Sequence, residues 1–147
     1  EEAAVARRAA LPQYPGKRVL LVEDDALNAR IASMMLAARG ITVVHAGNGA
    51  IGAREYENRG ERGLDLVLMD CQMPEMDGFQ ATAVIRASEN GGRRVPIIAL
   101  TAYAQPSDRL KCLSAGMDDH LPKPFRAEEL LAVLQRHLPP PAQGMAA

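Results

Sequence analysis

The sequence predicts an α/β domain in which a five-stranded parallel sheet is covered by helices on both faces. Two observations support this prediction. Five short apolar or β-branched segments alternate along the chain with five segments of helical periodicity. Several of the apolar segments are uninterrupted runs, which is typical of parallel strands that are buried on both faces. Strands that alternate with helices in this way form a doubly wound sheet.

The expected strands are short and each is followed by a loop or a helix. Val19–Val22 and Leu64–Met69 are buried runs that end next to acidic residues. Pro96 comes directly before another run, and proline is tolerated at the first residue of a strand. The five expected strands are residues 19–22, 41–45, 64–69, 97–100 and 118–121.

Five helices are expected between and after these strands. The first ends at Gly40, and Asp25 is expected to cap it rather than to bind metal. Asn48 is expected to cap a helix that runs to about Asn58, and the others cover residues 78–88, 107–113 and 127–138. One face of the first helix is apolar, with Met34 and Met35 expected in the core and at its rim; its members are Leu27, Ile31, Met34, Met35 and Ala38.

The chain of 147 residues is expected to hold one domain, over residues 17–138. Residues 1–16 are interpreted as a linker or the end of an upstream helix, and residues 139–147 as a proline-rich tail. The chain starts with Glu1 and has no signal-peptide pattern, so we interpret it as a piece of a longer protein.

Composition excludes several functional classes. The 17 basic and 18 acidic residues leave a net charge of −1, which argues against bulk electrostatic binding of nucleic acid or of a membrane surface. Two cysteines cannot form a disulfide scaffold, and no apolar run approaches the ~20 residues of a membrane span. The expected location is the cytoplasm, whether or not the parent protein is anchored in a membrane.

Reactive side chains follow the expected strands. Glu23 and Asp24 follow the first, Asp70 the third, Thr101 the fourth and Lys123 the fifth. The carboxyl ends of parallel strands meet at one edge of a sheet, where ligands bind. Clustered carboxylates repel one another unless a cation lies among them, and Mg²⁺ or Mn²⁺ suits oxygen ligands. An aspartate in such a site can accept a phosphoryl group, while a lysine and a hydroxyl stabilise its oxygens.

Four motifs carry a resemblance to a known family. They are LVEDD at residues 21–25, MDCQMPEMDG at 69–78, PIIALTA at 96–102 and LPKPF at 121–125. Together they resemble the response-regulator receiver domain of two-component signalling over residues 17–138, and are most similar to receivers of hybrid sensor histidine kinases. The resemblance implies a flavodoxin-like, or CheY-like, fold with strand order 2-1-3-4-5.

The resemblance also implies roles for the acidic residues. Asp70 matches the phosphate-accepting aspartate of the family. Asp24 matches a direct Mg²⁺ ligand, and Glu23 matches its acidic partner. Gln72 matches the position whose backbone carbonyl completes the metal site.

Further positions match the family's switch machinery. Thr101 matches the switch hydroxyl, and Lys123 matches the lysine that contacts the phosphoryl group and precedes a cis proline. His120 stands where the family usually has tyrosine or phenylalanine, which puts the usual aromatic switch in doubt while leaving His120 a candidate switch residue. Gln72 and Tyr103 occupy the two positions that tune autodephosphorylation, and their sizes predict restricted access of water.

The implied partner is a phosphohistidine, on a histidine kinase dimerisation domain or on a histidine-phosphotransfer domain. Docking is expected to use the first helix near Asn28, Ile31 and Met35. By this interpretation the domain catalyses its own phosphorylation and slow dephosphorylation without being a conventional enzyme. We expect a monomer or a weak dimer that binds no nucleic acid and does not contact a membrane directly.

Three alternatives are open. One is a receiver-shaped docking module that regulates its parent kinase without phosphorylation. Another is dinucleotide binding, because Gly47–Gly52 fits G-x-G-x-x-G between a strand and a helix, although this leaves the other strand-end residues without a role. The third is a Mg²⁺-dependent phosphatase, which needs a general acid two residues after the nucleophile; Gln72 at that position cannot donate a proton in this way.

Overall fold

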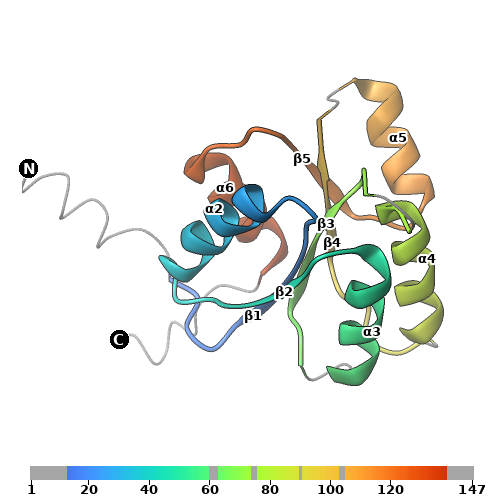
Figure 1. Cartoon of the computed structure of the whole chain (residues 1–147), viewed down its shortest axis with the longest axis horizontal. Coiled ribbons are helices and arrows are strands. Elements are labelled where there is room, and N and C mark those ends of the chain that lie inside the picture. The colour runs from blue at the N-terminus through green and yellow to red at the C-terminus, as the bar shows by residue number, and fades with distance from the viewer. Residues whose placement is uncertain (1–12, 60–62, 74–75, 90, 103–104, 139–147) are drawn as a thin grey trace, which may run out of the picture.

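A computed structural model describes residues 13–59, 63–73, 76–89, 91–102 and 105–138. Within these ranges, five parallel strands form one sheet in the order β2-β1-β3-β4-β5 (Figure 1). The prediction of a doubly wound sheet with strand order 2-1-3-4-5 is therefore confirmed. The strands are β1 (Arg18–Val22), β2 (Thr42–Ala46), β3 (Leu66–Asp70), β4 (Ile97–Thr101) and β5 (Asp119–Pro122).

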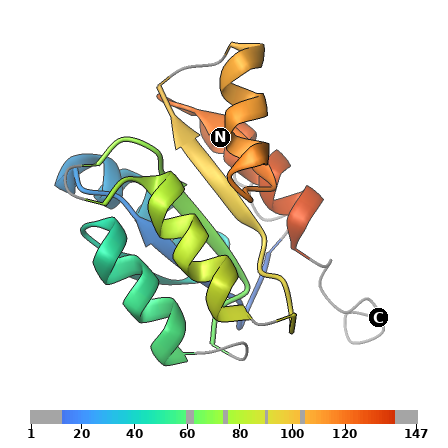
Figure 2. The ribbon, with the colours of Figure 1, turned by 90° about the vertical axis from the view of Figure 1, so that its right-hand side faces the viewer.

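In the described ranges, five helices cover the two faces of the sheet. Figures 1 and 2 show this arrangement from two directions. One face carries α2 (Ala26–Ala37) and α6 (Ala127–His137). The other face carries α3 (Gly49–Arg59), α4 (Gly78–Glu89) and α5 (Pro106–Ser114). Each helix lies within a few residues of its predicted range.

The residues of β1 alternate between the two layers of the core. Val19 and Leu21 pack in the cluster that includes α2 and α6, whereas Leu20 and Val22 pack in the cluster that includes α3, α4 and α5. All four side chains are fully buried. Burial of the strand on both faces therefore explains the uninterrupted apolar run, as predicted, because successive strand residues point to opposite faces.

The expectation that Met34 belongs to the core is wrong, because α2 packs through another face. Leu27, Ile31 and Met34 are 66%, 44% and 64% exposed. The buried residues of this helix are instead Ala29, Ala32 and Leu36. Two small alanines permit a close approach of the helix to the sheet, and Leu27, Ile31 and Met34 are left on the outside.

The folded part of the chain begins before residue 17. Tyr14, which lies in the range interpreted as a linker, is buried in the same core cluster as α2 and α6. Its backbone N–H donates to the carbonyl of Arg39 at 2.7 Å, and its own carbonyl accepts from Lys17 at 3.2 Å. The chain thus enters the sheet after packing against the end of α2.

Two of the three glycines in the Gly47–Gly52 motif have a packing role. A Cβ at Gly52 would lie 2.7 Å from a methyl carbon of Val22, and one at Gly49 would lie 2.5 Å from the Met76 carbonyl oxygen. Asn48 caps the helix, as predicted, by accepting from the N–H of Ile51 at 2.8 Å. The close approach of Gly52 to β1 and of Gly49 to Met76 accounts for these two glycines without a bound nucleotide.

A partly buried ionic network lies at the amino ends of β4 and β5. Arg86 of α4 donates to the carbonyls of Val95 at 2.7 Å and Gly116 at 2.9 Å, and to the Asp118 carboxylate at 2.7 Å. Glu89 receives two further bonds from Arg86, one from the hydroxyl of Tyr56 and one from the Val95 N–H. This network joins α3, α4 and the loop after α5.

Candidate functional site

Three carboxylates meet at the carboxyl ends of β1 and β3. Glu23, Asp24 and Asp70 each offer an oxygen, and these oxygens lie within 4.8 Å of one another. They meet because β1 and β3 are parallel neighbours in which Val22 pairs with Met69. Glu23 and Asp70, the next residues along the chain, therefore lie beside each other at the same edge of the sheet. Glu23 and Asp70 are each 2% exposed, whereas Asp24 is open to solvent.

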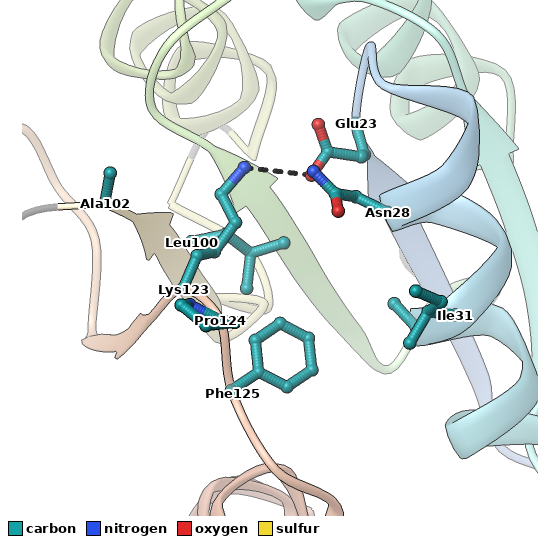
Figure 3. Close-up of a pocket in the computed structure, with 9 residues that line it drawn as sticks. Glu23, Asn28, Ile31, Leu100, Ala102, Lys123, Pro124 and Phe125 are labelled. Carbon is teal, nitrogen blue, oxygen red and sulfur yellow. Dashed lines mark hydrogen bonds and ion pairs between the residues drawn. The ribbon is translucent and has the colours of Figure 1, made fainter.

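Lys123 brings a positive charge into this cluster from the loop after β5. Its Nζ lies 3.0 Å from Oε1 of Glu23 and 3.3 Å from Oδ2 of Asp70. Figure 3 shows the side chain reaching across toward Glu23. The Lys123 N–H donates to the carbonyl of Thr101 at 2.7 Å, and the bond to Pro124 is cis, as the resemblance implies.

Burial and hydrogen bonding shift the pKa values of the groups in this cluster in different directions. Burial raises the pKa of Asp70 to about 7, and the hydrogen bond to Glu23 acts in the same direction. Burial also opposes ionisation of Glu23, but hydrogen bonds from Asp70 and Lys123 hold its pKa below the usual value. For Lys123, burial is outweighed by the two carboxylates, which raise its pKa. The ion pair of Lys123 with Glu23 therefore persists while Asp70 gains a proton easily.

The donor set of this cluster suits a hard divalent cation. Three carboxylates offer oxygen ligands of the kind that Mg²⁺ binds through one or two protein groups and waters. Two of them are buried and share a single ammonium, so the site has an excess of negative charge when all three are ionised. The Gln72 N–H donates to Oδ1 of Asp70 at 3.1 Å, which places the backbone of this loop beside the acids.

Asp25 has the capping role predicted for it. Its carboxylate accepts from the N–H of Asn28 at 2.9 Å at the start of α2, and its own N–H donates to Oε2 of Glu23 at 3.2 Å. Asp25 is absent from the group of three whose oxygens lie together. The two adjacent aspartates therefore have different surroundings, because Asp24 belongs to the group of three acids and Asp25 caps the helix.

The two predicted switch residues lie on neighbouring strands. Thr101 is buried at the end of β4, where it pairs with Pro122 of β5. His120 is partly buried on β5, and its Nδ1 lies 3.9 Å from Oδ1 of Asp119. In the described part of the chain this buried Nδ1 has no hydrogen-bond partner. Tyr103, the other predicted tuning residue, lies outside the described residues.

A cavity of about 380 Å³ adjoins Lys123 and Glu23. Ile31 of α2 and Phe125 line it, as do Asn28 and Leu100, and Figure 3 shows these side chains around the open space. The sequence interpretation assigned Phe125 no role in the site. The sequence feature that could have indicated a role for Phe125 is its position directly after the Lys123-Pro124 pair.

The chain belongs to the response regulator receiver domain family, whose model matches residues 19–135. Hybrid signal transduction histidine kinase B of Dictyostelium discoideum is 41% identical over 133 residues, covering 83% of this chain and 7% of that protein. Sensor protein GacS of Pseudomonas syringae pv. syringae is 40% identical over 121 residues, covering 80% and 13%. The chain thus spans a small part of the curated relatives that it matches.

Solved structures extend this similarity to the fold. The receiver domain of sensor histidine kinase PA1611 from Pseudomonas aeruginosa PAO1 is 48% identical, with a TM-score of 0.73 over 83% of this chain and 97% of that one. That structure has a magnesium ion coordinated in its active site cleft. The receiver domain of histidine kinase CKI1 from Arabidopsis thaliana, complexed with Mg²⁺ and BeF₃⁻, is 35% identical, with a TM-score of 0.74 over 83% and 89%.

The chain is therefore a receiver domain of two-component signal transduction, and its curated relatives include hybrid histidine kinases. Among the described helices, none combines the length and apolar character that crossing a membrane requires.

Proposed function

We propose that this domain accepts a phosphoryl group on Asp70 from a phosphohistidine, and thereby switches conformation or relays the group onward. The observation that carries the proposal is the position of Lys123, whose ammonium contacts both Glu23 and the buried Asp70. A buried carboxylate beside a lysine and a second acid has the nucleophile, the counter-charge and the cation ligands that phosphoryl transfer needs.

In the proposed step an ionised oxygen of Asp70 forms a bond to phosphorus while the bond from phosphorus to the histidine nitrogen breaks. The electron pair of the broken bond stays on the imidazole. Lys123 exchanges its contact with Asp70 for one with a phosphoryl oxygen. Thr101, at the end of the adjacent strand β4, donates its hydroxyl to another phosphoryl oxygen, and this movement starts the switch.

The proposed cofactor is Mg²⁺, held by Glu23, Asp24, Asp70 and the backbone carbonyl of Gln72. Bound there, the cation supplies charge neutralisation for the phosphoryl oxygens. Two receiver domains of known structure, at 48% and 35% identity, contain Mg²⁺, which supports the assignment. Mn²⁺ has the same preference for oxygen ligands and is the natural substitute to test.

The proposed partner is the helical bundle of a histidine kinase dimerisation domain or of a histidine-phosphotransfer domain. The exposed Leu27, Ile31 and Met34 of α2 offer it an apolar face, and Ile31 also lines the cavity beside Lys123. By this proposal residues 17–138 with the Tyr14 segment work in the cytoplasm as a monomer or weak dimer, joined to a parent kinase. Neither nucleic acid nor a membrane surface is a proposed partner, given the net charge of −1.

The decisive experiment is the intact mass of the protein after incubation with acetyl phosphate, with and without Mg²⁺. We expect one phosphoryl group in the presence of Mg²⁺ and none in the Asp70→Asn variant. Asp77→Asn is the matched control, because Asp77 caps α4 by accepting from the Gln80 N–H at 2.9 Å and stands outside the acid cluster. Phosphorylation of Asp70→Asn at the normal rate would show that the acceptor is another residue.

The exposed apolar face of α2 would also serve a module that docks without phosphorylation. That alternative predicts no mass gain from acetyl phosphate or from any phosphorylated histidine donor. It also predicts that Asp70→Asn still regulates the parent kinase normally. The buried acids and their lysine favour phosphorylation, since docking through α2 requires none of them.

A further inference from the structure

The two cysteines of the chain lie in the same cluster of the core. Cys71 directly follows Asp70 at the end of β3, and Cys112 lies 41 positions later in the chain, on α5. Both thiols are free and buried, with exposures of 6% and 3%. They belong to one core cluster and line one cavity. They therefore form a pair that spans the reactive strand end and a helix on its flank.

A small cavity connects this pair to the phosphoacceptor side of the molecule. It has a volume of about 130 Å³, and both cysteines line it together with Thr101 and Gln72. Lys111, also in its wall, holds its ammonium 4.8 Å from the ring centre of Phe79. A water molecule occupies about 30 Å³ in the liquid, so the cavity has room for a hydroperoxide.

We propose that Cys71 and Cys112 are a peroxide-responsive thiol pair that closes to an intramolecular disulfide and thereby restrains α5. The geometry carries this assignment, because the two cysteines come from different elements, pack in one core cluster and line one cavity. In a reducing compartment a disulfide of this kind is transient, which is the usual character of redox-sensing pairs. The consequence for signalling rests on the proposed phosphorylation of Asp70, whereas formation of the disulfide does not.

The reaction balances with a hydroperoxide as the oxidant. One thiolate attacks the peroxide, giving a sulfenic acid and hydroxide, and the second thiol then displaces water to form the sulfur–sulfur bond. In sum, two thiols and one H₂O₂ give one disulfide and two waters.

The disulfide would fix two segments that the proposed switch moves relative to each other. Cys71 is held to β4 through its N–H, which donates to the Leu100 carbonyl at 3.0 Å. The Cys112 carbonyl accepts from the Met117 N–H at 3.0 Å at the end of α5. A covalent bond between them ties β3, the residue after Asp70 and α5 together. We expect this bond to slow phosphoryl uptake. Thr101 moves in the proposed switch, and α5, the next element along the chain, would be held in place by the disulfide.

Formation of the disulfide is tested by treating the protein with H₂O₂ and then alkylating the remaining thiols with iodoacetamide under denaturing conditions. We expect loss of both alkylation sites together, a Cys71–Cys112 peptide in the digest and full reversal by dithiothreitol. Cys112→Ser and Cys71→Ser are expected to remain alkylatable or to stop at a sulfenic acid. Two thiols that stay free at high peroxide, independent overoxidation of each, or disulfides only between molecules would overturn the proposal.

The effect on signalling is measured as the rate of phosphoryl uptake from acetyl phosphate with Mg²⁺, before and after oxidation. Coupled sites commonly change each other's equilibria about fivefold or more, and we expect a slowing of this size that dithiothreitol reverses. Equal rates in the two forms would overturn the restraint on α5. The reduced protein also separates the two proposals, because failure of the reduced form to accept phosphate counts against the proposed function and leaves the thiol chemistry standing.

Discussion

The ammonium of Lys123 lies 3.0 Å from the carboxylate of Glu23, although 100 positions separate them in the chain. This bond joins the loop after β5 to the end of β1, two strands that are not neighbours in the sheet. Asp70 lies at the end of β3, the strand between β1 and β4. Its carboxylate is 3.3 Å from the same ammonium. The acid cluster is thus held together by one side chain from the far edge of the sheet.

Replacing Lys123 with methionine keeps most of the side-chain volume and removes this charge. The two buried acids then lack a counter-charge, and we expect the free energy of unfolding without Mg²⁺ to fall by about 3 kcal/mol at neutral pH. We expect Mg²⁺ binding to be retained and phosphoryl uptake to fall more than metal affinity. Urea unfolding with and without MgCl₂ measures the first effect. Lys111→Met, on the exposed face of α5, is the control, and equal losses in both variants would contradict the prediction.

Asp24 and Asp25 offer a matched comparison between neighbouring acids. Asp24→Asn is expected to weaken Mg²⁺ binding at least about tenfold, because it removes a charged ligand from the cluster. Asp25→Asn is expected to leave both Mg²⁺ affinity and stability nearly unchanged, because asparagine caps a helix as well as aspartate does. Calorimetric titration with MgCl₂ distinguishes the two. Loss of affinity in Asp25→Asn alone would reverse our assignment of the two residues.

The affinity for Mg²⁺ should depend on pH. Burial and Glu23 raise the pKa of Asp70 to about 7 in the metal-free protein, so below pH 7 the cation must displace a proton. Affinity is therefore expected to fall by up to about tenfold per pH unit below 7 and to level off above it. Titrations in two buffers of different ionisation enthalpy report the protons released. We expect roughly one proton per ion at pH 6 and close to none at pH 8, and a flat profile would mean that Asp70 is ionised throughout.

Gly78 is expected to be required for the shape of the acid cluster. A Cβ at this position would lie 2.3 Å from the carbonyl oxygen of Asp70, so alanine must push α4 away from the end of β3. We expect Gly78→Ala to lower the free energy of unfolding by about 2 kcal/mol and to weaken Mg²⁺ binding. Gly47→Ala is the control, since a Cβ there meets nothing within 4 Å. Equal behaviour of the two variants would argue against the packing explanation.

Much of the fold could be predicted because strand burial and helix periodicity both leave strong patterns. The run Val19–Val22 is buried on both faces, and its neighbours at the strand end were expected to form the acid cluster. The face of α2 was harder, since hydrophobicity favoured Leu27 and Met34 over Ala29 and Ala32. Small residues that allow close packing carry little apolar weight in a sequence pattern.

The details of the site depend on side-chain reach, which no local pattern contains. The sequence predicts that Lys123 and Glu23 lie at the same edge of the sheet, but not that they form an ion pair in the absence of a phosphoryl group. Nor does it predict that Cys71 and Cys112 line the same cavity, because this depends on how α5 lies against β3. The burial of Tyr14 was missed since a Pro/Gly-rich segment resembles a linker.

The bonds of Arg86 have a consequence for comparing states of this domain. Arg86 lies near the end of α4 and donates to Gly116, just beyond the end of α5, while the acids lie at the opposite ends of the strands. Both helices are therefore fastened at the end remote from Asp70. When a change at the acids moves α4 and α5, we expect the two helices to tilt, with the largest movement near Asp70 and the smallest near Arg86. The surroundings of Arg86 accordingly provide a natural frame of reference on which to superpose two functional states.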